Sequence, residues 1–145
     1  MKKIILVRYG QYENGNLTEE GINTMTETAG RLKVSGLDKS SVVISSETPR
    51  AFQSAKVISE ILESKFLVNN SFYAAEEDGV FVDNAKAAQF VNTFSSDVDN
   101  LIIVASREYI ESFPAYFLET KENTRLERGE CLVIDCENKS ISYIK

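Results

Sequence analysis

Three short apolar runs, each followed by a helical pattern, constrain the fold of this chain more than any other feature. Residues 3–7, 41–45 and 101–105 are rich in valine, isoleucine and leucine, which is typical of strands buried on both faces. A polar corner and then a segment with helical spacing of apolar residues follow each run. This alternation predicts an α/β fold, a three-layer sandwich in which helices cover both faces of a mostly parallel sheet.

The first two helices have clear start signals. Thr18 is expected to cap the first, which should stop near Gly36, and Thr48 followed by Pro49 should open the second, which should reach about Glu63. The spacing predicts the inward positions Ile22, Met25, Ala29 and Leu32 in the first helix, and Ala51, Ala55, Ile58 and Leu62 in the second.

The rest of the chain gives a weaker pattern. We expect a brief strand over 66–68, a loop over 76–79, and a helix capped by Asp83 that carries Ala87, Val91 and Phe94. A helix should follow Ser106 toward Leu118, with Pro114 either beginning its main part or kinking it. Its aromatic residues Tyr109, Phe113, Tyr116 and Phe117 are expected in the core, and the alternative is that they form an oligomer face. A C-terminal β-hairpin should form from 130–135 and 140–144.

Length and composition limit the function classes. The 145 residues suit a single domain spanning 1–145, and the net charge of −6 argues against nucleic-acid binding. No run approaches the roughly 20 apolar residues that cross a bilayer, and residues 4–7 are too short for a signal-peptide core, so no membrane association and a cytoplasmic location are expected. Cys131 and Cys136 are expected to be free thiols, and no metal site or cofactor is predicted.

Arginines stand at the strand-to-helix corners. The corners are Arg8-Tyr9-Gly10, residues 45–50 ending in Arg50, and Ser106-Arg107. Ligands of parallel α/β sheets bind beyond the carboxyl ends of the strands, and helix N-termini attract anions. Converging corners would therefore form a cationic pocket of phosphate size, whereas the alternative is a set of surface arginines paired with nearby acids.

The same corners resemble the histidine phosphatase (phosphoglycerate mutase-like) superfamily. That family begins with a buried strand ending in Arg-His-Gly, followed by Leu-Thr-x-x-Gly and then Ser-Ser-x-x-x-Arg-Ala-x-Gln-Thr-Ala. This chain carries Arg8-Tyr9-Gly10, Leu17-Thr18-Glu19-Glu20-Gly21, and Ser45-Ser46-Glu47-Thr48-Pro49-Arg50-Ala51-Phe52-Gln53-Ser54-Ala55. The similarity extends over nearly the whole chain and is closest to the short phosphohistidine-phosphatase-like members.

The resemblance implies a role for each matched residue. Arg8 and Arg50 match the two arginines that bind phosphate, whereas Tyr9 stands at the nucleophilic histidine and Ser106 at the second histidine. Arg107 would add a third positive charge or point to solvent. The general acid of larger members has no secure equivalent, and Glu76, Glu77 and Asp78 are only regional candidates.

The chain contains no histidine at all, which excludes a phosphohistidine intermediate. A tyrosine has an ordinary pKa of about 10, so only about 0.1% is phenolate at pH 7. The sequence therefore favours a pseudophosphatase without conventional phosphatase or mutase activity, in which Arg8, Arg50, Tyr9, Ser106 and Arg107 bind phosphate, a phosphometabolite or a phosphoprotein. The alternatives are phosphoryl transfer through Tyr9 and a non-catalytic protein-interaction domain. The sequence does not define the oligomeric state.

Overall fold

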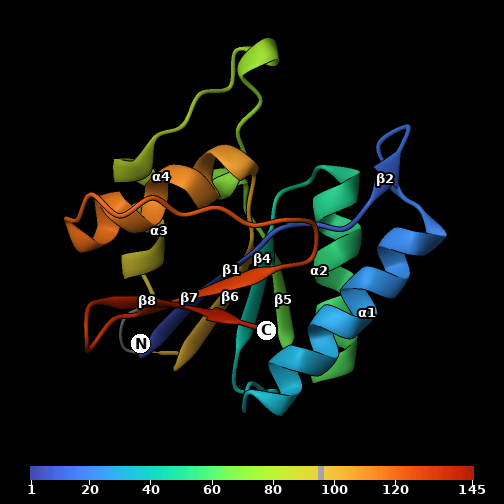
Figure 1. Ribbon diagram of the computed structural model, residues 1–145, viewed down its shortest axis with the longest axis horizontal. Coiled ribbons are helices and arrows are strands. Elements are labelled where there is room, and N and C mark those ends of the chain that lie inside the picture. Colours follow the sequence, from blue (N-terminus) through green and yellow to red (C-terminus); the bar gives the residue numbers. More distant parts are fainter. Residues whose placement is uncertain (95–96) are drawn as a thin grey trace.

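The computed structural model describes residues 1–94 and 97–145. Its main sheet has the strand order β5-β4-β6-β1-β7-β8 (Figure 1). These strands are β1 (Lys3–Val7), β4 (Val42–Ser45), β5 (Lys65–Val68), β6 (Asn100–Val104), β7 (Cys131–Asp135) and β8 (Ser140–Ile144). The β5, β4, β6 and β1 strands run parallel, whereas β7 is antiparallel to β1 and forms the predicted hairpin with β8.

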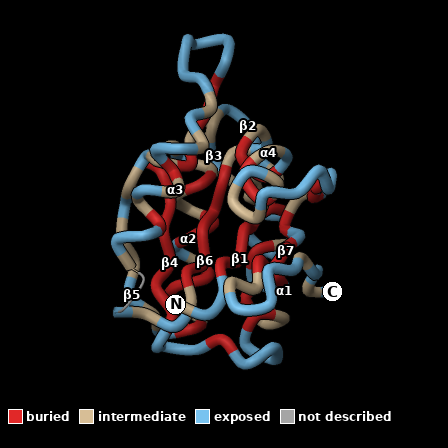
Figure 2. Tube along the Cα trace, turned by 90° about the vertical axis from the view of Figure 1, so that its left-hand side faces the viewer, coloured by how far each residue is buried: buried red, intermediate tan, exposed pale blue. Residues whose placement is uncertain are grey.

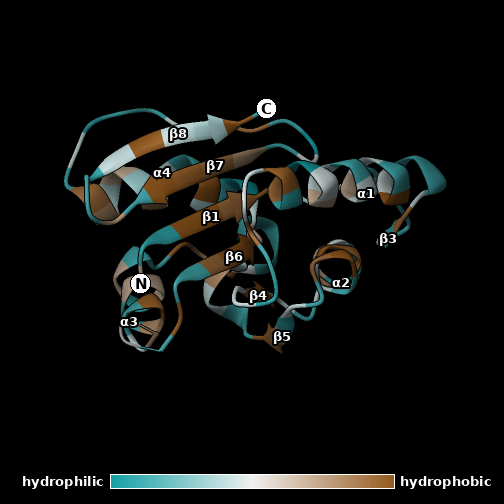
Figure 3. Ribbon diagram, turned by 90° about the horizontal axis from the view of Figure 1, so that it is seen from below, coloured by the Kyte–Doolittle hydropathy of each residue, from teal (hydrophilic) through white to brown (hydrophobic). Residues whose placement is uncertain are grey.

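Helices cover both faces of this sheet. On one side lie α1 (Glu19–Val34) and α2 (Pro49–Leu62), and on the other α3 (Asn84–Asn92) and α4 (Arg107–Leu118) (Figure 3). The central strands are buried between two apolar clusters, one formed with each helix pair (Figure 2). The predicted three-layer α/β architecture with a mostly parallel sheet is confirmed.

Most of the predicted helix caps and buried helix positions are present in the structure. Thr18 caps α1 by accepting a hydrogen bond from the Gly21 amide at 3.1 Å, and Asp83 caps α3 through the Lys86 amide. Thr48 occupies the N-cap position of α2 but its side chain makes no capping bond. The predicted inward positions are buried except Ile22, which is 47% exposed.

The exposure of Ile22 follows from which face of α1 is buried. At the start of α1 the inward position is occupied by Gly21, where a Cβ would lie only 2.0 Å from the Gln11 carbonyl oxygen. Met25 and Leu32 continue this buried face. Ile22 lies about 100° around the helix from Gly21, at the margin of the face, so the prediction for Ile22 was wrong.

Pro114 neither begins α4 nor ends it, because the helix continues from Arg107 to Leu118 with the proline inside. A proline has no N–H to donate to the carbonyl four residues earlier. That carbonyl, of Ile110, accepts a hydrogen bond of 2.6 Å from the Thr124 hydroxyl, and Thr124 is buried. A residue beyond the helix thus satisfies the group that the proline leaves without its usual donor.

Several smaller expectations needed correction. The strands expected from 41 and 130 begin one residue later, Phe94 lies beyond the end of α3, and the expected loop at 76–79 contains a 3₁₀ turn, η2 (Glu76–Asp78). A second 3₁₀ turn, η1 (Asn70–Phe72), precedes it. Tyr109 and Phe113 are buried as predicted, but Tyr116 is 49% exposed. Cys131 and Cys136 are free thiols, as expected.

A small hairpin was not predicted. Strands β2 (Tyr12–Glu13) and β3 (Asn16–Leu17) pair antiparallel. The two residues between them have positive φ values, 52° at Asn14 and 84° at Gly15, which is the conformation that an Asn-Gly hairpin turn adopts. This hairpin follows the Arg8-Tyr9-Gly10 corner and places Tyr12 beside it.

Candidate functional site

The first corner of the site is built by the end of β1. The Arg8 amide donates to the Glu130 carbonyl at 3.1 Å, and the Gly129 amide donates to the Arg8 carbonyl at 2.9 Å. These bonds extend the β1–β7 pairing by one more pair of contacts. The Arg8 side chain is 16% exposed, and its Nη1 donates to the Leu126 carbonyl at 2.9 Å. Arg8 is therefore held between the sheet and the segment that precedes β7.

Arg50 enters the site from the first turn of α2. Its Cζ lies 5.0 Å from the centre of the Tyr9 ring and 4.7 Å from that of Tyr12. Burial acts to lower the pKa of Arg50, but a hydrogen bond with Tyr9 and the neighbouring tyrosines raise it, and the net change is upward. Arg50 is thus a cation at neutral pH.

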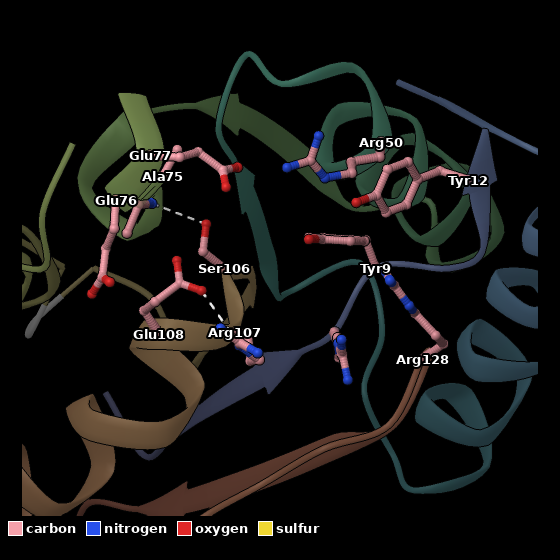
Figure 4. A pocket seen from close by; sticks show the side chains of 12 residues that line it. Tyr9, Tyr12, Arg50, Ala75, Glu76, Glu77, Ser106, Arg107, Glu108 and Arg128 are labelled. Atoms are coloured by element: carbon pink, nitrogen blue, oxygen red, sulfur yellow. Dashed lines mark hydrogen bonds and ion pairs between the residues drawn. The ribbon is translucent and has the colours of Figure 1, made fainter. Parts of the chain in front are cut away.

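A second guanidinium lies over the same two rings. The Cζ of Arg128 is 5.1 Å from the Tyr9 ring centre and 4.9 Å from that of Tyr12. The rings meet edge to face, with their centres 5.6 Å apart. Figure 4 shows both tyrosine hydroxyls pointing into the pocket, with Arg50 and Arg128 at the sides of the pair. Cation–π contacts of this kind stabilise by roughly 0.5–1 kcal/mol each at exposed sites, so the pair holds the two guanidiniums near each other.

The β2–β3 hairpin that supplies Tyr12 is fastened to α2. The Leu17 amide donates to Gln53 Oε1 at 2.7 Å, and Gln53 Nε2 donates to Asn16 Oδ1 at 2.8 Å. Gln53 is part of the motif around Arg50. The same helical turn therefore positions both Arg50 and the hairpin that carries Tyr12.

The third corner differs in its chemistry. Ser106 Oγ accepts a hydrogen bond of 3.0 Å from the Ala74 amide, and the Ser106 amide donates to the Phe72 carbonyl at 3.0 Å. Arg107 lies 3.5 Å from the carboxylate of Glu108, and its side chain is 60% exposed. Ser106 therefore anchors the neighbouring segment, while the charge of Arg107 is partly balanced by Glu108.

These residues line one pocket of about 300 Å³ (Figure 4). The five residues predicted to form the site, Arg8, Tyr9, Arg50, Ser106 and Arg107, all line it. The other lining residues are Tyr12, Ala74, Ala75, Glu76, Glu77, Glu108 and Arg128. The structure therefore brings together the three corners that the sequence singled out.

Arg128 and Tyr12 are among the pocket residues that the sequence did not predict. Residues that precede an antiparallel strand lie at the same sheet edge as residues that follow its parallel neighbours. The hairpin pattern at the C-terminus was therefore the signal that could have found Arg128, just before β7. For Tyr12 the signal was the Asn14-Gly15 pair, which favours a hairpin that folds back on its own corner.

Buried donors in the pocket have no partner among the described residues. They are Nε of Arg8, Nε of Arg50 and Nη1 of Arg128. Leaving a charged donor buried and unpaired is costly, so such groups favour binding of an anion. Within residues 1–94 and 97–145 no group of acidic or cysteine side chains could hold a metal ion. No helix in this same part of the chain is both long and apolar enough to cross a membrane.

Comparison with known proteins identifies the fold. No protein-family model and no curated protein sequence matches the chain. Solved structures do match, and the phosphatases among them share the histidine phosphatase (phosphoglycerate mutase-like) fold.

The similar structures cover almost all of the chain. A mycobacterial glucosyl-3-phosphoglycerate phosphatase in complex with VO3 aligns with a TM-score of 0.76 and 12% identity, over 99% of this chain and 97% of its own. A phosphoserine phosphatase from Entamoeba histolytica, in complex with 3-phosphoglyceric acid, aligns with a TM-score of 0.72 and 16% identity, over 100% and 96%. A protein described as a phosphohistidine phosphatase from Agrobacterium tumefaciens aligns with a TM-score of 0.74 and 11% identity, over 99% and 96%. At these identities the comparison establishes the fold.

Proposed function

We propose that the pocket binds the phosphate group of a phosphorylated ligand and that the protein lacks conventional phosphatase and mutase activity. The observation that carries the proposal is the gathering of Arg8, Arg50 and Arg128 in one concave site with unpaired, buried N–H donors. Guanidinium groups bind phosphate oxygens through short charge-assisted hydrogen bonds. Mycobacterial glucosyl-3-phosphoglycerate phosphatase, whose fold is similar, has been captured with inorganic phosphate.

The absence of catalysis follows from the side chains at the reacting position. Tyr9 and Ser106 stand where the resemblance places two histidines, and the whole chain has none. Ser106 Oγ already accepts the Ala74 amide, so it serves the structure of the pocket wall. Loss of a nucleophile typically reduces turnover by about 10⁴- to 10⁶-fold.

Binding is tested by titrating inorganic phosphate at low ionic strength with calorimetry or amide chemical shifts. Hydrogen bonds to a charged group are worth roughly 1.5–3 kcal/mol, so Arg50→Ala should weaken phosphate binding tenfold or more. Arg125→Ala is the matched control, because Arg125 is 77% exposed and does not line the pocket. Failure to bind at millimolar phosphate, with no effect of Arg50→Ala, would leave only the interaction-domain alternative.

Catalysis is tested with p-nitrophenyl phosphate. We expect no turnover above the uncatalysed rate, and turnover that Tyr9→Phe abolishes would support phosphoryl transfer through Tyr9 instead. A phosphotyrosine adduct at this residue, detected by mass spectrometry, would do the same. The converse experiment restores histidines with Tyr9→His and Ser106→His together and measures whether hydrolysis appears.

A further inference from the structure

The pocket is larger than a bare phosphate ion requires. Its volume of about 300 Å³ lies at the lower end of pockets that hold small organic ligands. A phosphate held by the arginines would therefore occupy only part of it. The remaining wall should show what the rest of the ligand looks like.

That remaining wall carries negative charge. Glu76 and Glu77, both on η2, line the pocket, and neither forms an ion pair within the described part of the chain. Glu108 also lines it but is paired with Arg107 at 3.5 Å. Figure 4 shows the Glu77 carboxylate pointing across the pocket toward the Arg50 guanidinium. The pocket is thus cationic on one side and anionic on the other.

The acidic wall is held in place at both of its ends. Before η2, Ser106 binds the Phe72 carbonyl and the Ala74 amide, each at 3.0 Å. After η2, the Asp83 amide donates to the Tyr109 hydroxyl at 3.0 Å. Between these anchors, Ala75 and Val80 exchange amide–carbonyl bonds of 2.8 and 3.0 Å. The fold therefore holds the backbone that carries Glu77, while its side chain is exposed.

A carboxylate held opposite an arginine site discriminates among phosphorylated ligands. It repels the tail of a ligand that carries a second anionic group and attracts a tail that carries a positive charge. We propose that this pocket takes a zwitterionic phosphate monoester, with its phosphate at the arginines and an ammonium group against Glu77. The inference rests on the proposed phosphate site and names the class of ligand for it.

The test compares three phosphate esters of similar size and inorganic phosphate. O-phosphoethanolamine carries an ammonium group, 2-hydroxyethyl phosphate is neutral at that end, and phosphoglycolate carries a carboxylate. One partly exposed charge contact changes affinity by up to roughly fivefold. We therefore expect affinity to fall by about that factor from the ammonium ester to the neutral ester, and further for phosphoglycolate.

Two variants make the test specific to Glu77. Glu77→Gln should make the affinities for the ammonium ester and the neutral ester equal, and inorganic phosphate should bind no more weakly than to the unchanged protein. Asp78→Asn makes the same change of charge on the same turn, and because Asp78 does not line the pocket the preference should persist.

The outcomes separate the two proposals. Equal affinities for the ammonium and neutral esters, or a preference that survives Glu77→Gln, overturn the zwitterion inference, while Arg50-dependent binding of inorganic phosphate still supports the phosphate site. Failure of all four anions to bind overturns both.

Discussion

The Thr124 hydroxyl should stabilise the fold because it serves the carbonyl that Pro114 leaves without its usual donor. The perturbation is Thr124→Val, which keeps nearly the same shape and replaces the hydroxyl with a methyl group. The hydroxyl donates to the Ile110 carbonyl at 2.6 Å, and Thr124 is 3% exposed. A buried acceptor that loses its partner costs about 1–3 kcal/mol. For a chain of this size that corresponds to a fall in Tm of roughly 3 to 10 °C.

The assay is urea unfolding followed by circular dichroism, with the change read from the midpoint at constant m. Thr26→Val is the matched control, because its hydroxyl donates to the Ile22 carbonyl at 2.8 Å on the exposed side of α1. That bond competes with water, so its loss should cost less than about 0.5 kcal/mol.

The variant Pro114→Ala tests whether the Thr124 hydroxyl compensates for the missing N–H of Pro114. Pro114→Ala restores a backbone N–H that can donate to the Ile110 carbonyl. In that background the cost of Thr124→Val should fall by about 1 kcal/mol, since the carbonyl keeps one donor. An equal cost in both backgrounds would refute the compensation between the proline and the threonine.

Three further predictions concern the stability of the fold and the Cys131 thiol. Gly129→Ala should destabilise by roughly 1–3 kcal/mol in urea unfolding, because Gly129 has φ +74° and a Cβ there would lie 2.4 Å from Thr24 Cγ2; an unchanged midpoint would contradict this. Burial raises the pKa of the Cys131 thiol from 9.0 to about 12, so the thiol ionises at lower pH in the unfolded chain than in the folded one. The free energy of unfolding should therefore be unaffected by this thiol below about pH 9 and should fall as pH rises toward 12. Cys131→Ala should reduce this fall, measured by urea unfolding at several pH values. Tyr109→Phe should cost about 1 kcal/mol and speed hydrogen exchange of the Asp83 amide, which loses its acceptor.

The fold could be read from the sequence because its strongest signals are local. Strands β1, β4 and β6 each combine a short apolar run with a corner and a following helix, and these patterns fix both the element and its direction. Arg8, Arg50 and Ser106 could be assigned to one sheet edge for that reason alone, since the carboxyl ends of parallel strands meet there.

The missed parts of the site do not follow a strand-corner-helix pattern, and turn signals alone do not place them. Hydrophobic alternation does not give the direction of a strand, so Arg128 could be placed only once β7 was known to run antiparallel beside β1. Strands β2 and β3 have two residues each, too few for any periodicity, which is why Tyr12 was overlooked. Ile22 lies at the margin of the buried face of α1, and helical spacing alone does not decide whether a residue at such a margin is buried.

The pair of tyrosines between two guanidiniums also gives the protein an optical probe. The chain has six tyrosines and no tryptophan, so its near-ultraviolet absorption and emission come mainly from phenol rings. Two of these rings lie in the pocket wall against Arg50 and Arg128. An anion that draws either cation off the ring faces would change their spectrum directly, so occupancy of the pocket can be followed without attaching a dye.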